Sequence, residues 1–394
     1  MKKQTQAIHL EYERRDAYDS LSVPVYNTLA YEFDNAAVMA EAFTDKIKAP
    51  DYSRVENPTV TNLERRVAAL TDAAHATAFN SGMAAISNTL MALAAQGKNI
   101  VTSKHLFGNT YALLVATLRR FGVKVRLRDL TNIEAVREAI DDDTCCVFLE
   151  ILTNPQLEVA DLKAISEVAH EKNVPLVVDS TVIPFTQFSA KSLGVDIEVV
   201  SSSKYVSGGA TSLGGLVIDY GTPYNGDFAK RLYGEMLFNF GAYMTPQVAY
   251  MQTIGLETLD ARYRVQSSNA LELAKKLRSL PQIKLVNYVG LEDNPYHELA
   301  QRQFEKTAGA MICIDLESKE ACFSFLNNLK LIHRATNLFD NRSLAIHPAS
   351  TIFGAFSENM RKSMDVKDTT IRLSIGLEDV DDLFEDIKQA VDCL

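Results

Sequence analysis

The sequence lacks the features that would place the protein at a membrane or on nucleic acid. No apolar stretch approaches the roughly 18 uninterrupted residues needed to cross a bilayer, and the segment MKKQTQAIHLEYERRD breaks into charge where a signal peptide would be apolar. Acidic residues outnumber basic ones by 50 to 40, for a formal net charge of -10. Because nucleic acid and anionic membranes both require a basic surface, we expect neither as a partner. The sequence instead favours a cytoplasmic protein that acts on a small molecule.

Cysteines are few and poorly spaced for metal binding. The five cysteines, at positions 145, 146, 313, 322 and 393, form no CxxC pair and show no spacing to histidine that is typical of a metal site. Two of them lie in the apolar run CCVFL, where small buried strand residues are the simpler interpretation. We therefore predict no disulfide and no metal. The chain also has no internal repeat and no low-complexity tract, which argues against solenoids and modules joined by linkers.

What the sequence does contain is an alternation of apolar runs and helical segments. The predicted strands are HATAFN, NIVTS, VKVRL, TCCVFLE, VPLVVD, IEVVSSS and LGGLVID, and helices are expected near residues 82–95, 110–121, 133–140 and 161–172. This order is typical of an α/β protein with a mostly parallel sheet covered on both faces.

From about residue 246 the pattern changes to that of a smaller α+β domain. It begins with a long amphipathic helix near 258–279, continues with strands in KLVNYV, AMICIDL and TIRLSIG, and ends with a helix near 379–392. A chain of 394 residues exceeds the usual size of one core. We therefore expect an N-terminal arm (1–55), a large domain (56–245) and a C-terminal α+β domain (246–394).

Several polar residues follow the predicted strands of the large domain. Ligands of parallel sheets bind beyond the carboxyl ends of the strands, where Asn80, Asp179 and the serines at 201–203 are expected. Lys204 follows directly in SSSKYVSGGATSLGG, and lysine rarely enters a core unpaired. Burial there would lower the pKa of Lys204, so that its neutral amine could attack an aldehyde. The alternative is a strand-end lysine that reaches solvent.

Other positions suit the same crevice. A carboxylate at Asp179 can keep a pyridine nitrogen protonated, although a strand-end aspartate also serves as a turn former. Ser81, Gly82 and Met83 lie where a strand gives way to a helix, whose exposed N–H groups bind phosphate; Ser81 as a plain N-cap is the alternative. Arg372 in TIRLSIG suits a bidentate grip on a carboxylate, against the alternative of a surface arginine.

Seven motifs occur in the order found in one known family. They are YSRVENPTVTNLERRVAAL, FNSGMAAI, the Asn154 and Pro155 pair, VVDST, SSSKY, HPAST and IRLSIGLED. From about residue 22 to the C-terminus the chain resembles the Cys/Met metabolism enzymes that depend on pyridoxal 5′-phosphate (PLP), which include cystathionine γ-synthase, cystathionine lyases, methionine γ-lyase and homoserine-ester sulfhydrylases. The resemblance implies PLP as cofactor and the aspartate aminotransferase-like fold of PLP-dependent transferases (fold type I).

The resemblance also implies roles for individual residues. Lys204 looks like the Schiff-base lysine and proton shuttle, and Asp179 like the partner of the pyridine nitrogen. The implied contacts to the rest of the cofactor come from Ser81, Gly82, Met83, Asn154, Ser201 and Ser203. The implied substrate-binding residues are Asn154, Arg372 and Ser350. Tyr52 and Arg54 resemble the pair that reaches the phosphate of the adjacent subunit, which implies a homo-oligomer, a dimer of dimers.

One departure from the family pattern concerns the cofactor's stacking partner. In LFGNTY, Phe107 stands where many members have a tyrosine stacked on the cofactor. Stacking survives, because it needs only an aromatic face. The hydroxyl, which in the lyases is thought to help proton transfer or leaving-group departure, does not survive. Tyr111 is the candidate substitute, with simple packing as the alternative.

The choice within the family depends on this departure. Phe107 and the stretch NLFDNRSLAIHPAST are similar to the sulfhydrylases. We therefore predict γ-replacement on an activated homoserine ester: O-acetylhomoserine reacts with sulfide or a thiol to give homocysteine or a thioether and acetate, in methionine and cysteine metabolism. Methionine γ-lyase and cystathionine γ-synthase or lyase stay open as alternatives, and a PLP-binding regulator without turnover is the alternative from another class.

Overall fold

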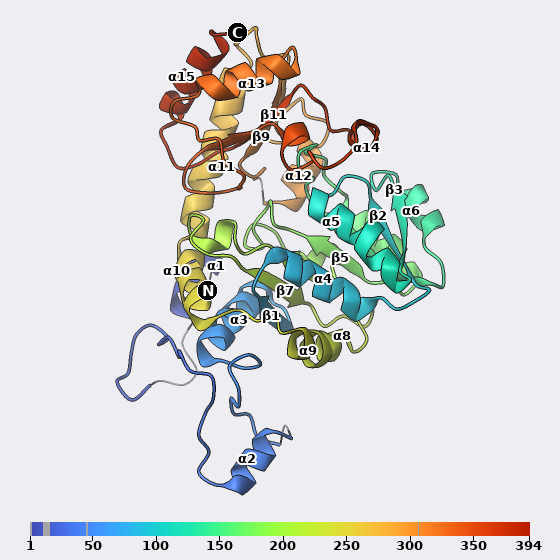
Figure 1. Ribbon diagram of the computed structural model, residues 1–394, viewed down its shortest axis with the longest axis vertical. Helices are drawn as coiled ribbons and strands as arrows, with labels where there is room; N and C mark the ends of the chain where they lie inside the picture. The colour runs from blue at the N-terminus through green and yellow to red at the C-terminus, as the bar shows by residue number, and fades with distance from the viewer. Residues whose placement is uncertain (1, 11–15, 45, 306) are drawn as a thin grey trace.

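The larger of two sheets contains most of the predicted strands. The structure, a computed structural model, describes residues 2–10, 16–44, 46–305 and 307–394 (Figure 1). Among these residues the larger sheet has seven strands in the order β1-β7-β6-β5-β4-β2-β3. Only β7 runs antiparallel to its neighbours, so the predicted mostly parallel sheet is confirmed. The strands are β1 (His75–Phe79), β2 (Asn99–Ser103), β3 (Lys124–Arg128), β4 (Thr144–Glu150), β5 (Leu176–Asp179), β6 (Ile197–Val200) and β7 (Gly215–Asp219).

Helices bury both faces of this sheet, which explains why its strands read as continuous apolar runs. Along β4, Val147 belongs to the apolar core on one face and Phe148 to the core on the other, and both are fully buried. The short α9 (Phe238–Phe240) has no buried residue. The helices around one core are α4 (Gly82–Leu93), α5 (Gly108–Ala112) and α8 (Phe228–Arg231). Those around the other are α3 (Pro58–Thr71), α6 (Ile133–Ala139), α7 (Leu162–Glu171) and α10 (Pro246–Glu257).

A second, antiparallel sheet follows in the C-terminal part of the chain. Its order within the described residues is β10-β11-β9-β8, and α11, α13 and α15 pack together beside it (Figure 1). The strands are β8 (Leu285–Asn287), β9 (Met311–Asp315), β10 (Leu344–Ile346) and β11 (Thr370–Ser374). The helices are α11 (Leu259–Leu277), α12 (His297–Gln303), α13 (Lys319–Asn328), α14 (Glu358–Ser363) and α15 (Val380–Val391). The boundaries at 55 and 245 stay predictions.

One predicted helix differs from the observed one, and α10 was not predicted. The helix expected over 110–121 begins as α5, continues as a π-helical turn (Leu113–Thr117) and ends as a 3₁₀ turn (Leu118–Phe121). The helix expected over 258–279 is α11, and α10 precedes it as a separate helix. In α10, a Cβ at Gly255 would lie 2.0 Å from the carbonyl oxygen of Val206, so glycine lets this helix pack closely behind the segment that carries Lys204. The short elements β10, α12 and α13 were not predicted.

The N-terminal region holds two helices that the sequence did not indicate. In α1 (Lys3–His9), Ala7 is buried, and its carbonyl accepts a hydrogen bond of 2.7 Å from Arg66 Nη1 on α3. By contrast, α2 (Ala36–Ala42) projects away from both sheets (Figure 1). This projecting part exposes large apolar side chains, with Leu29 at 66% and Phe43 at 58%.

Two further observations concern membranes and metals. No helix in the described part of the chain is both long enough and apolar enough to cross a bilayer. Among the same residues, no three His, Cys, Asp or Glu side chains are grouped so that they could hold a metal ion. The five cysteines are free thiols.

Candidate active site

A cavity of about 310 Å³ opens at the carboxyl ends of the parallel strands. This is where α/β sheets bind ligands, and the volume is in the range of small-molecule sites. The larger sheet and its connections supply most of the wall, and the C-terminal sheet closes it with Arg372 on β11. The lining residues are Ser81, Gly82, Met83, Ile86, Phe107, Asn109, Glu150, Asn154, Asp179, Thr181, Val182, Ser201, Ser203, Lys204, Leu213, Thr336, Asn337, Leu338, Ile352 and Arg372.

Lys204 enters the cavity from the turn that follows β6. The hydroxyl of Ser203 braces this turn, because it accepts a hydrogen bond from Gly214 N (2.9 Å) and donates one to Gly214 O (3.1 Å). At the tip, Lys204 Nζ donates to Asn337 Oδ1 at 2.8 Å. Burial, and then the positive charge of Arg372, lowers the pKa of Lys204 to about 8. The lysine is therefore a partly buried amine that can become neutral near physiological pH.

Two carboxyl groups stand side by side at the ends of β4 and β5. Glu150 and Asp179 are direct partners in the parallel register. Burial raises the pKa of Asp179, while hydrogen bonds from Thr181 oppose the rise; Thr181 N donates to Asp179 Oδ1 at 2.9 Å. Burial, and then the charge of Asp179, raises the pKa of Glu150 to about 8. The sequence reasoning missed Glu150, although it ends the run TCCVFLE in the same way that Asp179 ends VPLVVD.

The N-terminus of α4, where the sequence predicts phosphate binding, lines the cavity. Ser81 is the N-cap, since its Oγ accepts a hydrogen bond from Ala84 N at 3.1 Å. The amides of Gly82 and Met83 come next, and helix geometry gives them no intrahelical acceptor. A Cβ on Gly82 would lie 2.5 Å from Ser201 Cβ, so only glycine allows the helix to approach the β6 turn this closely. The hydroxyl of the other predicted ligand, Ser203, is engaged with Gly214 as described above.

Arg372 is buried rather than on the surface, with 3% of its area exposed. Its Nη1 donates to Asn154 Oδ1 and its Nη2 to the carbonyl oxygen of Asn337, each at 3.1 Å. Burial lowers the pKa of Arg372 to about 10, which still leaves it charged at neutral pH. Its buried Nε has no hydrogen-bond partner among the described residues. An unpaired donor on a buried cation is unusual and indicates a place for an anionic ligand.

Not all of the predicted site residues lie on this cavity. Phe107 lines it, but Tyr111 does not; the ring of Tyr111 packs edge-on against Phe356, with centroids 5.9 Å apart. Ser350 is exposed and also lies outside the lining, with its Oγ 2.8 Å from His347 Nδ1. The sequence reasoning missed Asn337, which contacts both Lys204 and Arg372 from a segment far away in the chain.

Tyr52 and Arg54 also lie away from the cavity. The Arg54 guanidinium carbon is 5.4 Å from the ring centroid of Tyr52 and 5.4 Å from that of Phe238, and Arg54 Nη1 donates to Phe238 O at 2.5 Å. Both residues line a separate hollow together with residues 27–29, 243 and 245–247. Tyr52 is 40% exposed.

The residues on the cavity wall fit PLP. An amine that can become neutral suits the aldehyde, and a strand-end carboxyl group suits the pyridine nitrogen. A Cβ on residue 82 would fill the space between the start of α4 and Ser201, which glycine leaves open. The backbone amides of Gly82 and Met83 beside that space suit a phosphate. The unpaired Nε of Arg372 leaves a donor for a substrate carboxylate.

Comparison with known proteins also indicates a PLP-dependent enzyme, over nearly the whole chain. The family model for Cys/Met metabolism PLP-dependent enzymes matches residues 4–392. The L-methionine gamma-lyase of Fusobacterium nucleatum subsp. polymorphum is 37% identical over 392 residues, covering 98% of this chain and 97% of that protein. The O-acetyl-L-homoserine sulfhydrylase of Corynebacterium glutamicum is 31% identical, covering 98% of this chain and 95% of that protein.

A solved structure agrees in fold and in cofactor. A Campylobacter jejuni protein, described as an O-acetylhomoserine (thiol)-lyase, was crystallised with pyridoxyl-lysine monophosphate. It superposes with a TM-score of 0.95 at 35% identity, and the match covers 100% of both chains. The implied fold type I and the PLP cofactor are thereby confirmed. The chain belongs to the Cys/Met metabolism family of PLP-dependent enzymes.

Proposed function

We propose that this enzyme joins O-acetylhomoserine to sulfide or a small thiol, forming homocysteine or a thioether and releasing acetate. The observation that carries this proposal is Phe107 on the cavity wall, an aromatic ring without a hydroxyl. A ring without a hydroxyl can stack, but it cannot pass a proton to a leaving thiolate. The sulfhydrylase from Corynebacterium glutamicum and the thiol-lyase from Campylobacter jejuni support the same reaction class.

In this proposal the proton transfers depend on Lys204. Bound PLP supplies an electron sink that stabilises negative charge at the substrate Cα. Lys204 is the residue that attaches to the PLP aldehyde; as a free amine it takes the proton from Cα and then moves protons at Cβ. Asn337 Oδ1, 2.8 Å from Nζ, holds the amine in the cavity between transfers. Asp179 keeps the proton on the ring nitrogen.

The remaining lining residues orient the cofactor and the substrate. The amides of Gly82 and Met83 and the side chain of Ser201 hold the phosphate at the start of α4. Arg372 binds the α-carboxylate of the amino acid, with its guanidinium fixed by Asn154. Because both groups are set on rigid elements, the substrate Cα is held near Lys204.

We propose further that the enzyme is a homo-oligomer, a dimer of dimers, in which Tyr52 and Arg54 complete the neighbouring subunit's phosphate site. Both residues lie outside the cavity of their own chain, and the projecting region from 16 to 44 exposes large apolar side chains. Exposed apolar patches of this kind mark interaction surfaces. A cytoplasmic location stays a prediction.

One comparison of rates tests the reaction. The PLP-saturated enzyme should form homocysteine from O-acetylhomoserine and sulfide with a kcat/KM at least about tenfold, or roughly 1.4 kcal/mol, better than its release of 2-oxobutanoate from methionine alone. The same preparation assayed with O-succinylhomoserine identifies the preferred acyl group. Faster elimination from methionine than replacement on the ester would contradict the proposal.

Methionine γ-lyase is the second candidate, because a relative of that name is 37% identical to this chain. It would use the same cofactor and carboxylate contacts. The two candidates differ in their need for a second sulfur compound. A lyase expels methanethiol from Cγ without one, whereas a sulfhydrylase needs added sulfide or thiol to attack Cγ. Dependence of product formation on sulfide therefore separates them.

A further inference from the structure

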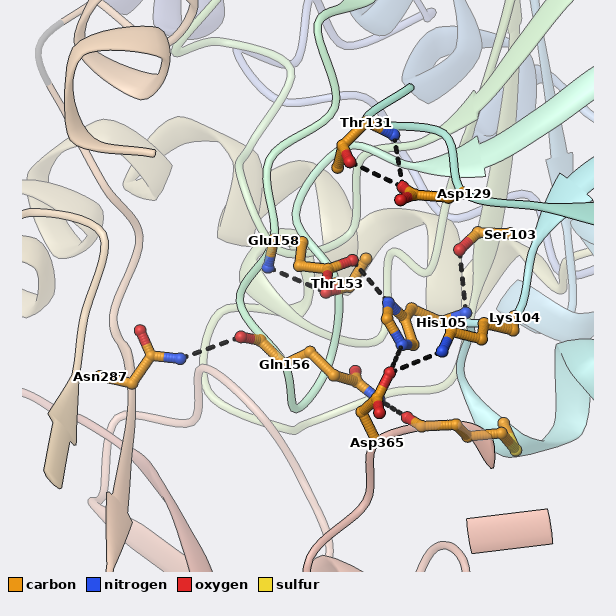
Figure 2. Close-up of polar contacts among 11 residues, drawn as sticks. Ser103, Lys104, His105, Asp129, Thr131, Thr153, Gln156, Glu158, Asn287 and Asp365 are labelled. Atoms are coloured by element: carbon orange, nitrogen blue, oxygen red, sulfur yellow. Dashed lines mark hydrogen bonds and ion pairs between the residues drawn. The ribbon is translucent and has the colours of Figure 1, made fainter. Parts of the chain in front are cut away.

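A buried histidine just before Phe107 bridges two carboxylates. His105 Nδ1 lies 2.5 Å from Glu158 Oε2, and His105 Nε2 lies 2.7 Å from Asp365 Oδ2. The His105 side chain is only 7% exposed. Lys104 Nζ also reaches Asp365 Oδ2, at 2.7 Å, so the neighbouring cation neutralises part of the charge (Figure 2). A neutral imidazole donates from one nitrogen only, so this arrangement favours the imidazolium, which donates from both.

The bridge joins three segments that each lead to a residue on the cavity wall. His105 follows β2 and comes two positions before Phe107. Glu158 lies in the turn that begins with Asn154, and Asp365 lies shortly before β11, which carries Arg372. These three segments are far apart in sequence, with 53 positions between His105 and Glu158 and 260 between His105 and Asp365. The contacts therefore tie both sheets together beside the site.

Secondary hydrogen bonds stiffen the same junction (Figure 2). Gln156 Nε2 donates to the carbonyl oxygen of Met364 at 2.6 Å, and Asn287 Nδ2 donates to Gln156 O at 2.9 Å. The backbone amide of His105 itself donates to Ser103 Oγ at 2.9 Å. The turn that holds Glu158 is thus fixed from the C-terminal sheet as well as from β2.

The charges around the imidazole determine how the bridge depends on pH. The groups that face it are Glu158, Asp365 and, through Asp365, Lys104. Tyr296 lies near Glu158 and near Asp129. Burial alone would lower the pKa of His105, but hydrogen bonds and charge from Glu158 and Asp365 outweigh it and raise that pKa above the ordinary value for histidine. The stability from the bridge is therefore fully present below the unfolded pKa and is lost as pH rises through the folded one.

We propose that His105 is a positioning residue that sets the relative placement of Phe107, Asn154 and Arg372 by bridging Glu158 and Asp365. The expected effect on the KM for the amino acid rests on the function proposed for the cavity, whereas the expected effect on PLP binding does not depend on which reaction the enzyme catalyses. His105 does not line the cavity, and it acts through the segments that do.

The test compares H105Q with a matched control. Gln has a single donor nitrogen and its other end is an acceptor oxygen, so it cannot replace the two ring nitrogens that reach the two carboxylates. H170Q removes a similar pair, His170 Nε2 to Asp196 Oδ2 at 2.8 Å, at the start of β6 and away from the cavity. H105Q should raise the Kd for PLP, measured by near-visible absorbance, and the KM for the amino acid, each by about tenfold. H170Q should lower the melting temperature and leave both constants unchanged.

A double variant checks the mechanism independently of any activity. In H105Q/E158Q the carboxylate of Glu158 is gone and two amides can pair, whereas Asp365 keeps its ion pair with Lys104, so PLP should bind no more weakly than to H105Q alone, and the two changes should not add. The melting-temperature difference between wild type and H105Q should shrink as pH rises. Unchanged PLP affinity in H105Q, or equal effects of H105Q and H170Q, would overturn the proposal. Absence of sulfhydrylase activity in the wild type would instead contradict only the proposed reaction.

Discussion

At the scale of single residues, burial shifts the charged groups of the cavity toward their neutral forms. The pKa of Lys204 falls to about 8 and that of Asp179 rises, whereas Arg372 stays charged because its pKa falls only to about 10. One cavity thus contains an amine that can lose its proton and a cation that cannot. The first suits proton transfer, and the second suits a substrate carboxylate.

This difference predicts how the cofactor attaches. Only the neutral amine of Lys204 attacks an aldehyde, so the rate at which the apoprotein takes up PLP should rise with pH, with a midpoint near the pKa of about 8. Stopped-flow absorbance between acidic and alkaline buffers measures this rate. K204R, whose side chain stays protonated throughout, is the control and should show no such uptake. A rate independent of pH would mean that another group attacks the aldehyde.

Replacement of Arg372 should affect substrate binding far more than cofactor binding. R372L removes the charge-assisted contacts to the carboxylate, each worth about 1.5–3 kcal/mol, so the KM for O-acetylhomoserine should rise by about 100-fold. The Kd for PLP should change little, because the proposed phosphate site lies at the start of α4, on the other wall. Steady-state kinetics and a PLP titration measure the two constants. A loss of PLP affinity with an unchanged KM would contradict the assignment.

At the scale of elements, the proposed phosphate site at the start of α4 depends on the close approach of this helix to the β6 turn. A methyl group at Gly82 would lie 2.5 Å from Ser201 Cβ. G82A should therefore push the helix start away from the turn, at a cost of about 1–3 kcal/mol, and should weaken PLP binding by about tenfold. Differential scanning fluorimetry with and without PLP measures both effects. A84G, at a neighbouring position of α4, is the control for helix propensity and should leave the PLP affinity unchanged.

At the scale of the whole molecule, the sequence indicated the elements better than the contacts between them. The alternation of apolar runs predicted the strands of the parallel sheet, and strand ends pointed to Asp179 and Lys204. Asn337, His105 and Glu158 were missed because their roles depend on contacts across the chain; Lys204 and Asn337 are 133 positions apart. Likewise, the helix predicted near 258–279 is confirmed as α11, but α10, which only Thr258 separates from α11, was not predicted.

The proposed oligomer makes a prediction that the monomer does not. If Arg54 serves the neighbouring site, K204A and R54A chains are each inactive alone, but a mixed dimer has one intact site. After an equimolar mixture is unfolded and refolded together, about a quarter of the sites should be active by random pairing. Activity assays on the mixture, with each variant refolded alone as control, measure this fraction. No recovery in a mixture that forms dimers would contradict the sharing of sites between subunits.

The proposed reaction depends most on the bond between Lys204 and PLP. Borohydride reduction of the PLP-loaded enzyme, followed by proteolysis and mass spectrometry, locates that bond directly. We expect the pyridoxyl group on the peptide that contains SSSKY, at Lys204, and none on K204R treated in the same way. A pyridoxyl group on any other lysine, or undiminished labelling of K204R, would contradict the central claim.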